Sequence, residues 1–188
     1  MSLELPHRWE HALIAATVKA ASAKCPNCDL GRTAIQKLLY FMNVSGVPMA
    51  YTFDIHHYGP FCQSVMSDVE WLLADSVIVD RSQNESHHSN YKPGPGLAEL
   101  EVQYKDGLGK YRPIVENVCS ALSDLSANTL ELIATLDFSF RWVRARGGQG
   151  PWRQEAIQKF KEIKQGKFAD TQIESWYGAL VGAKLISE

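Results

Sequence analysis

The chain has 188 residues, of which 45% are apolar and 21% are charged, and its formal net charge is −2. A chain of this size can bury a core without disulfides or metals, and its composition excludes a disordered or a membrane-embedded protein. No apolar run reaches the roughly 20 residues that span a bilayer, and charges interrupt the N-terminal apolar part, so we expect a cytoplasmic protein.

Helical and extended patterns alternate in the first half of the chain. We expect an extended segment over 47–58 and helices over about 5–23, 33–45 and 60–73. Pro60 is predicted at the first position of the last of these helices, and the preceding Gly59 permits a tight turn.

A hairpin and five more helices are predicted in the rest of the chain. The segments "SVIVDR" and "HHSNYKP" flank the polar turn-former "SQNES", as the strands of a β-hairpin do. The sequence "PGPG" at residues 93–96 then breaks the pattern. Helical periods resume beyond it, and we expect helices at about 99–107, 111–124, 127–145, 152–165 and 170–181.

These elements predict a mainly α protein with a small β component, that is, an α+β fold. We expect a compact helical bundle with short strands, for which a winged-helix-like arrangement is one alternative. A single domain over residues 1–188 is predicted, with sub-units 1–92 and 97–188 as the other possibility.

The stretch "TAIQKLLYFMNVSGVPMAYTFDIHHYGPFCQSVMSDVEWLLADSVI" resembles the uncharacterised YwgA-like proteins and, more distantly, the Panacea domain of SocA-like antitoxins. The helix "KLLYF", the extended segment ahead of "YGP" and the helix before "SVIV" carry this resemblance, which "LELIATLDF" and "FADTQIESWYGALVGAKLI" extend. The resemblance implies a mainly helical cytoplasmic protein that has no known catalytic apparatus or cofactor. Its partner would be a protein, such as a toxin or a regulatory target.

The run "HHYGPFC" holds the candidates for nucleophilic chemistry and for partner binding. Cys62 in the first turn of a helix would have a stabilised thiolate, and His56 or His57 could act as its base. The alternative is that the run only turns an extended segment into a helix, with Cys62 as a small boundary residue. An exposed aromatic surface for a partner protein would then consist of Tyr51, Phe53, Tyr58, Gly59 and Pro60.

The motif "CPNC" at Cys25 and Cys28 has the spacing of half a zinc site or of a redox pair. We favour instead a simple turn between two helices. In a reducing compartment all four cysteines, including Cys119, are expected to be thiols.

The segment 141–167 is basic, although the chain as a whole is weakly acidic. Its aromatic residues could stack on bases, so this segment is the candidate nucleic-acid surface; a solvated helix face is the alternative. Its positive residues are Arg141, Arg144, Arg146, Arg153, Lys159, Lys161, Lys164 and Lys167. The acidic residues Asp68, Glu70, Asp75 and Asp80 are expected at the surface.

We therefore expect a non-enzymatic interaction or regulatory protein, similar to an antitoxin or an adaptor, which acts by protein–protein contact. A winged-helix-type nucleic-acid binder that uses the basic segment is the alternative, and a Cys62-dependent enzyme is a second one. No phosphate-binding glycine loop, HExxH or GxSxG motif is present, and no cofactor is expected. The sequence does not define an oligomeric state.

Overall fold

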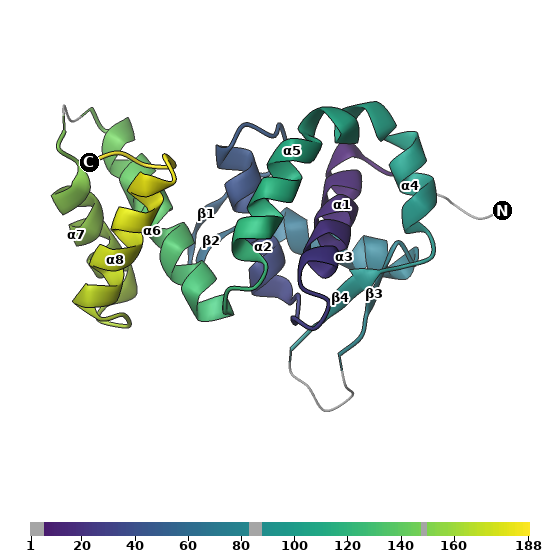
Figure 1. Cartoon of the computed structure of the whole chain (residues 1–188), viewed down its shortest axis with the longest axis horizontal. Helices are drawn as coiled ribbons and strands as arrows, with labels where there is room; N and C mark the ends of the chain where they lie inside the picture. The colour runs from purple at the N-terminus through teal and green to yellow at the C-terminus, as the bar shows by residue number, and fades with distance from the viewer. Residues whose placement is uncertain (1–5, 83–87, 148–149) are drawn as a thin grey trace. The chain divides into compact units, whose positions relative to one another are not determined.

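The computed structural model describes residues 6–82, 88–147 and 150–188, and it confirms a mainly helical α+β protein (Figure 1). Within these ranges there are eight helices and two antiparallel strand pairs. None of these helices is long and apolar enough to cross a membrane. Contacts divide the chain into two units, the first comprising Met1–Phe53 and Cys62–Leu125 and the second comprising Asp54–Phe61 and Ser126–Glu188.

The first unit is built around its N-terminal helix. Its elements are α1 (Trp9–Lys24), α2 (Arg32–Val44), α3 (Gln63–Ala74), β3 (Ile78–Asp80), β4 (Tyr91–Pro93), α4 (Leu97–Gln103) and α5 (Lys105–Leu122). Helices α2, α3, α4 and α5 and strand β4 all pack on α1. Apolar side chains therefore occupy most of its circumference, and Leu13, Ile14 and Val18 are fully buried.

The predicted hairpin after α3 is confirmed by the pairing of β3 with β4. Its register places Ile78 opposite Pro93 and Asp80 opposite Tyr91, and most of the predicted turn, at 83–86, lies outside the described residues. The "PGPG" segment continues the same unit, because the N–H groups of Gly94 and Gly96 donate to the carbonyls of Val77 and Ser76, in the turn between α3 and β3. The division between the units falls at Leu125 instead.

The second unit is centred on a long helix. Its elements are β1 (Asp54–His56), β2 (Gly59–Phe61), α6 (Ala127–Ala145), α7 (Arg153–Lys164) and α8 (Asp170–Gly182). The Ser126 hydroxyl caps α6 by accepting a hydrogen bond from the Thr129 N–H at 3.1 Å. Strand β2 and helices α7 and α8 pack on α6, which buries both apolar residues, such as Phe140, and polar ones, such as Glu131.

Two predictions around Gly59 are wrong. The segment 47–53 forms no strand, because its backbone groups find other partners; the Ala50 N–H, for example, donates to Glu10 at 2.8 Å. Gly59 adopts a φ of 87°, which closes a tight hairpin, and Pro60 then lies in β2 opposite Ile55. Helix α3 consequently begins at Gln63 and not at Pro60.

Candidate functional site

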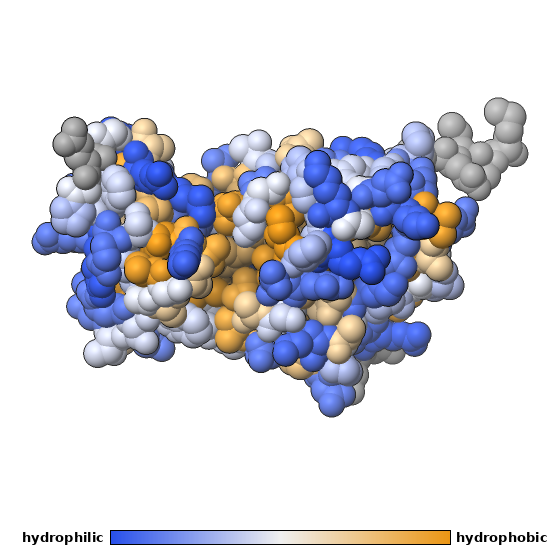
Figure 2. Space-filling view, turned by 45° about the horizontal axis from the view of Figure 1, so that its top comes forward, coloured by the Kyte–Doolittle hydropathy of each residue, from blue (hydrophilic) through white to orange (hydrophobic). Residues whose placement is uncertain are grey.

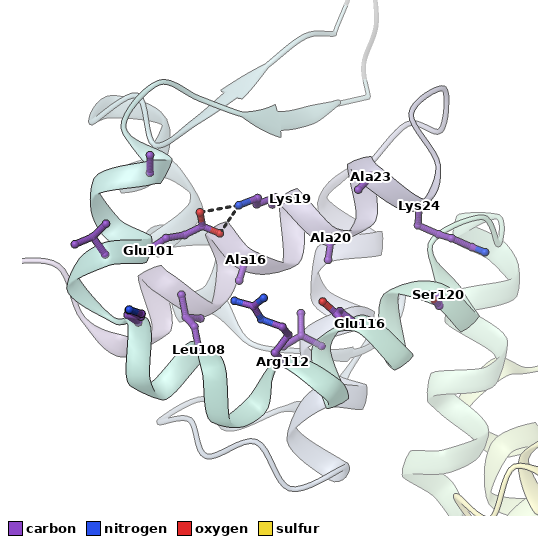
Figure 3. Close-up of a pocket in the computed structure, with 14 residues that line it drawn as sticks. Ala16, Lys19, Ala20, Ala23, Lys24, Glu101, Leu108, Arg112, Glu116 and Ser120 are labelled. Atoms are coloured by element: carbon purple, nitrogen blue, oxygen red, sulfur yellow. Dashed lines mark hydrogen bonds and ion pairs between the residues drawn. The ribbon is translucent and has the colours of Figure 1, made fainter.

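A groove of about 820 Å³ lies on the side of α1 that α4 and α5 flank (Figure 3). Its walls come from these three helices, all of which belong to the first unit. The lining residues are Ala16, Lys19, Ala20, Ala23, Lys24, Ala98, Glu101, Val102, Lys105, Leu108, Arg112, Val115, Glu116 and Ser120.

The floor of the groove is aliphatic and is spaced along helices. Ala16, Ala20 and Ala23 recur every three or four residues on α1, so they share one face that carries little side-chain volume. From Lys105 to Ser120, the lining residues of α5 extend over about four turns. On α4 the Val102 side chain is 76% exposed, and Figure 2 shows hydrophobic residues at the surface among hydrophilic ones.

Aromatic packing joins α1 and α5, two of the helices that line the groove. The Trp9 ring lies 6.5 Å from that of Tyr104 and 5.9 Å from that of Tyr111, measured between centroids. Gly107 allows this approach, because a Cβ at this position would lie 2.8 Å from the Trp9 ring. The Trp9 indole N–H donates to the carbonyl of Pro48 at 2.6 Å, which holds the ring in place.

The rim of the groove is charged. The Lys19 ammonium is 2.7 and 2.8 Å from the two carboxylate oxygens of Glu101, and this ion pair joins α1 to α4 (Figure 3). Lys24, Lys105 and Arg112 have no carboxylate partner among the described residues. Three unpaired cations therefore border an aliphatic floor.

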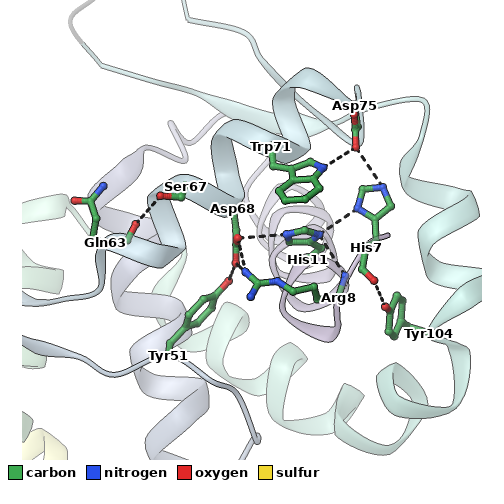
Figure 4. A network of polar contacts seen from close by, with 10 residues as sticks. All are labelled: His7, Arg8, His11, Tyr51, Gln63, Ser67, Asp68, Trp71, Asp75 and Tyr104. Atoms are coloured by element: carbon green, nitrogen blue, oxygen red, sulfur yellow. Dashed lines mark hydrogen bonds and ion pairs between the residues drawn. The ribbon is translucent and has the colours of Figure 1, made fainter. Parts of the chain in front are cut away.

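A buried polar network lies elsewhere in the first unit and centres on Asp68 of α3 (Figure 4). Its carboxylate accepts two hydrogen bonds from Arg8, at 2.5 and 2.6 Å, and one from the Tyr51 hydroxyl at 2.6 Å. The hydrogen bond to Asp68 raises the pKa of Arg8, and burial raises the pKa of Tyr51. The prediction that Asp68 lies at the surface is wrong, because Arg8 and Tyr51, which are distant from it in the sequence, bind its carboxylate in the interior.

His11 completes this network and is fully buried. Its Nδ1 accepts from the Arg8 N–H at 3.3 Å, while its Nε2 lies 3.3 Å from a carboxylate oxygen of Asp68. Burial lowers the pKa of His11, and the nearby positive charge of Arg8 and the ring of His7 act in the same direction, against the attraction of Asp68.

We expect stability to fall on mild acidification because of His11. Its pKa is lower in the folded than in the unfolded chain, so the unfolded chain binds more protons below about pH 6.5. The contribution of His11 to the free energy of unfolding is therefore complete above about pH 6.5 and is lost as the pH falls toward the folded pKa. Urea unfolding at about pH 7.5 and about pH 5.5 should show this loss, and His11→Gln should reduce the difference between the two pH values. An equal difference in wild type and variant would contradict the prediction.

The aromatic residues proposed for partner binding do not share one exposed surface. Tyr51 is only 6% exposed, so its predicted exposure is wrong; its hydroxyl is held by Asp68. The ring of Phe53 packs 5.6 Å from that of Tyr40. In the second unit Gly59 and Pro60 are buried within β2, while Tyr58 is 56% exposed and stays a predicted contact for a partner.

Cys62 lies at the N-cap of α3 and not in its first turn. The Gln36 side chain holds the backbone of Cys62 on both sides, since it donates to the carbonyl at 2.8 Å and accepts from the N–H at 3.0 Å. The thiol is buried and makes no hydrogen bond within the described ranges. His56 and His57 are exposed, and their rings pack on Phe61 and Tyr58. This arrangement gives Cys62 a structural role in starting α3.

Cys25 and Cys28 form a disulfide, so the prediction that all cysteines are thiols is wrong. The two residues follow α1, and a tight turn brings their Cα atoms to 5.3 Å. Lys92 of β4 donates to the carbonyls of Pro26 and Cys28 at 3.1 Å each, which holds the turn. Neither sulfur is then a free thiolate for a metal.

Most cations of the basic segment already have carboxylate partners. Lys164 and Lys167 both bind Glu131, at 2.8 Å, and Lys164 is buried. Four others are also paired: Arg141 with Asp137, Arg153 with Glu174 and Glu188, Lys159 with Glu162, and Lys161 with Asp170. Arg144 and Arg146 lie over the rings of Trp152 and Trp142.

The groove residues are the functional candidates that the sequence does not single out. The signal is present in the alanines at positions 16, 20 and 23, which mark an α1 face without bulky side chains. Only the packing of α4 and α5 shows that this face stays open and that cations surround it.

Comparison with known proteins gives one curated similarity. The chain is 22% identical over 107 residues to the uncharacterised protein YwgA of Bacillus subtilis (strain 168), and the match covers 57% of this chain and 63% of YwgA. No known family model matches the chain. The similarity supports a YwgA-like group at most, and the more distant resemblance to the Panacea domain stays a prediction.

Proposed function

We propose that the protein is a non-enzymatic interaction protein that binds an α-helix of a partner protein in the groove between α1, α4 and α5. The observation that carries this proposal is that α1, otherwise enclosed by its neighbours, leaves one aliphatic face open between two flanking helices. The biological role that we propose is regulatory, like that of an antitoxin or an adaptor, in line with the resemblance stated above.

A helix fits this groove better than an extended peptide does. Helices that bind in a groove insert side chains spaced three or four residues apart between two supporting helices. Here α1 and α5 provide two such supports: Ala16 and Leu108 lie toward one end, and Lys24 and Ser120 lie toward the other (Figure 3). The small side chains of α1 let a third helix approach closely. An extended peptide would need the free edge of a sheet or, as a polyproline II segment, a groove lined by aromatic side chains, and the lining of this groove has neither.

A nucleic-acid function has less support. Binding to a nucleic acid requires free cations that can replace the small counterions around its phosphates. Six of the eight cations in the basic segment are instead paired with carboxylates. Lys164 is in addition buried, so it cannot reach a phosphate.

Affinity purification with a blocked groove tests the proposed function. Ala20→Trp would fill the groove from the α1 side, and Ala121→Trp is the matched control, because Ala121 is exposed on α5 but does not line the groove. We expect at least one protein to be recovered from a lysate of the source organism with wild type and with Ala121→Trp, and its recovery to drop by about tenfold or more with Ala20→Trp.

Circular dichroism and thermal unfolding would show that both variants keep the wild-type fold. Undiminished recovery of every captured protein with Ala20→Trp would contradict the assignment of the groove as the binding surface.

A further inference from the structure

We infer that the partner helix is acidic, with carboxylates on both flanks of an apolar stripe. This inference rests on the proposed function and adds the chemistry of the partner. It is carried by the charges at the rim of the groove, which are positive in excess although the chain has a net charge of −2.

The unpaired rim charges lie on both sides of the floor. On α5, Lys105 and Arg112 are seven residues apart, which places them on one side of the helix. On α1, Lys24 lies on the opposite side of the groove and toward its other end (Figure 3). The unpaired acidic residue in the lining is Glu116, since Glu101 is neutralised by Lys19. A ligand that lies along the groove therefore meets positive charge on either side.

Arg112 holds the central place among these cations. Figure 3 shows its side chain between α1 and α5, near Leu108 and Glu116, where a docked helix would pass. The Arg112 side chain is exposed and has no hydrogen bond or ion pair with the described residues. A guanidinium can bind a carboxylate through two parallel hydrogen bonds, so Arg112 can select a helix that carries Asp or Glu beside its apolar face.

The lining itself argues against other anions. Among the described residues, no aromatic side chain lines the groove, so this lining offers no surface on which the bases of a nucleic acid could stack. Ala23, Ala98 and Val102 are all exposed, so the groove is open along its length and does not enclose a small molecule as most ligand pockets do. The combination of aliphatic floor, open length and cationic rim matches the apolar and acidic faces of one helix.

Selection from a peptide library tests the inference without the natural partner. A display library of helix-forming peptides of roughly 18 residues, randomised on one face, would be selected on the wild-type protein and depleted on Ala20→Trp. We expect the enriched peptides to carry more Asp and Glu than Lys and Arg beside their apolar positions. The affinity of such a peptide should fall about tenfold with Arg112→Glu, and it should also weaken between about 50 mM and about 500 mM salt. Arg146→Glu in the second unit is the matched control, because Arg146 is exposed, has no carboxylate partner and lies outside the groove.

Two outcomes would overturn the inference in different ways. Enriched peptides that are neutral or basic, or that bind Arg112→Glu as well as Arg146→Glu, would overturn the acidic partner while the groove stays a binding surface. The absence of any peptide sensitive to Ala20→Trp would overturn helix binding in the groove, and with it the proposed function.

Discussion

Replacing Glu131 with glutamine should lower the free energy of unfolding by about 3–5 kcal/mol, the range for breaking a buried ion pair from one side. The side chains of Glu131 and Lys164 are each only 3% exposed, and the Lys164 ammonium also donates to the His57 carbonyl at 3.0 Å. Burial alone would raise the pKa of Glu131, but hydrogen bonds from Lys164 and Lys167 outweigh it and hold this pKa below its usual value. The carboxylate is therefore charged at neutral pH, and Glu131→Gln would leave the buried ammonium without an anionic partner.

Urea unfolding followed by circular dichroism would measure this loss. The matched control is Lys161→Gln, because Lys161 and Asp170 are also close, at 2.9 Å, but their side chains are 41% and 75% exposed, so about 1 kcal/mol or less is expected. The double variant Glu131→Leu with Lys164→Met removes both charges and should recover most of the stability lost by Glu131→Gln. Equal losses for Glu131→Gln and Lys161→Gln would show that the buried pair contributes no more than a surface pair.

Asp68→Asn should have the second largest effect, a loss of about 3 kcal/mol. The asparagine amide would place N–H donors against the donors of Arg8 and Tyr51, where the carboxylate accepts three hydrogen bonds at 2.5–2.6 Å. It would also remove the negative charge beside the buried His11. Because Arg8 caps the start of α1 and Asp68 lies on α3, the substitution would loosen α1 at the end where Trp9 packs on α5.

Comparison with Asp75→Asn separates a buried from an exposed carboxylate in the same helix region. Asp75 contacts His7 and Trp71, but its side chain is 45% exposed, so about 1 kcal/mol or less should be lost. A loss for Asp68→Asn as small as that for Asp75→Asn, measured by urea unfolding, would mean that the network around Asp68 does not stabilise the first unit.

Patterns that are local in the sequence predicted the fold class correctly. The helical periods and the hairpin before "PGPG" depend on spacings of a few residues, which a single sequence displays. The contacts that define the sites join residues far apart in the chain: 60 positions separate Arg8 from Asp68, 33 separate Glu131 from Lys164, and 82 separate Lys19 from Glu101. No periodicity reports such pairs, so Asp68 was expected at the surface, and the cations of the basic segment were counted without their partners.

The aromatic candidates failed for a related reason. Alternation over 47–58 predicted which side chains share a face, but a strand forms only where a second strand accepts its hydrogen bonds. Within the described part of the chain, that partner exists for Asp54–His56 but not for Tyr51, whose hydroxyl instead donates to Asp68. The groove also depends on contacts between distant segments. The face of α1 that carries Ala20 stays uncovered because of the positions at which α4 and α5 pack on α1.

The hairpin of β1 and β2 has a consequence for how the chain can be divided. During synthesis the hairpin is completed well before α6, yet its strand β2 packs on α6. More than a third of the chain length separates the two in sequence. A cut after Leu125 would leave this hairpin on the N-terminal fragment and deprive the C-terminal fragment of the His57 carbonyl that Lys164 binds. The C-terminal fragment would then lack the hairpin of its own unit, so the second unit can be completed only when the chain is produced as one uninterrupted polypeptide.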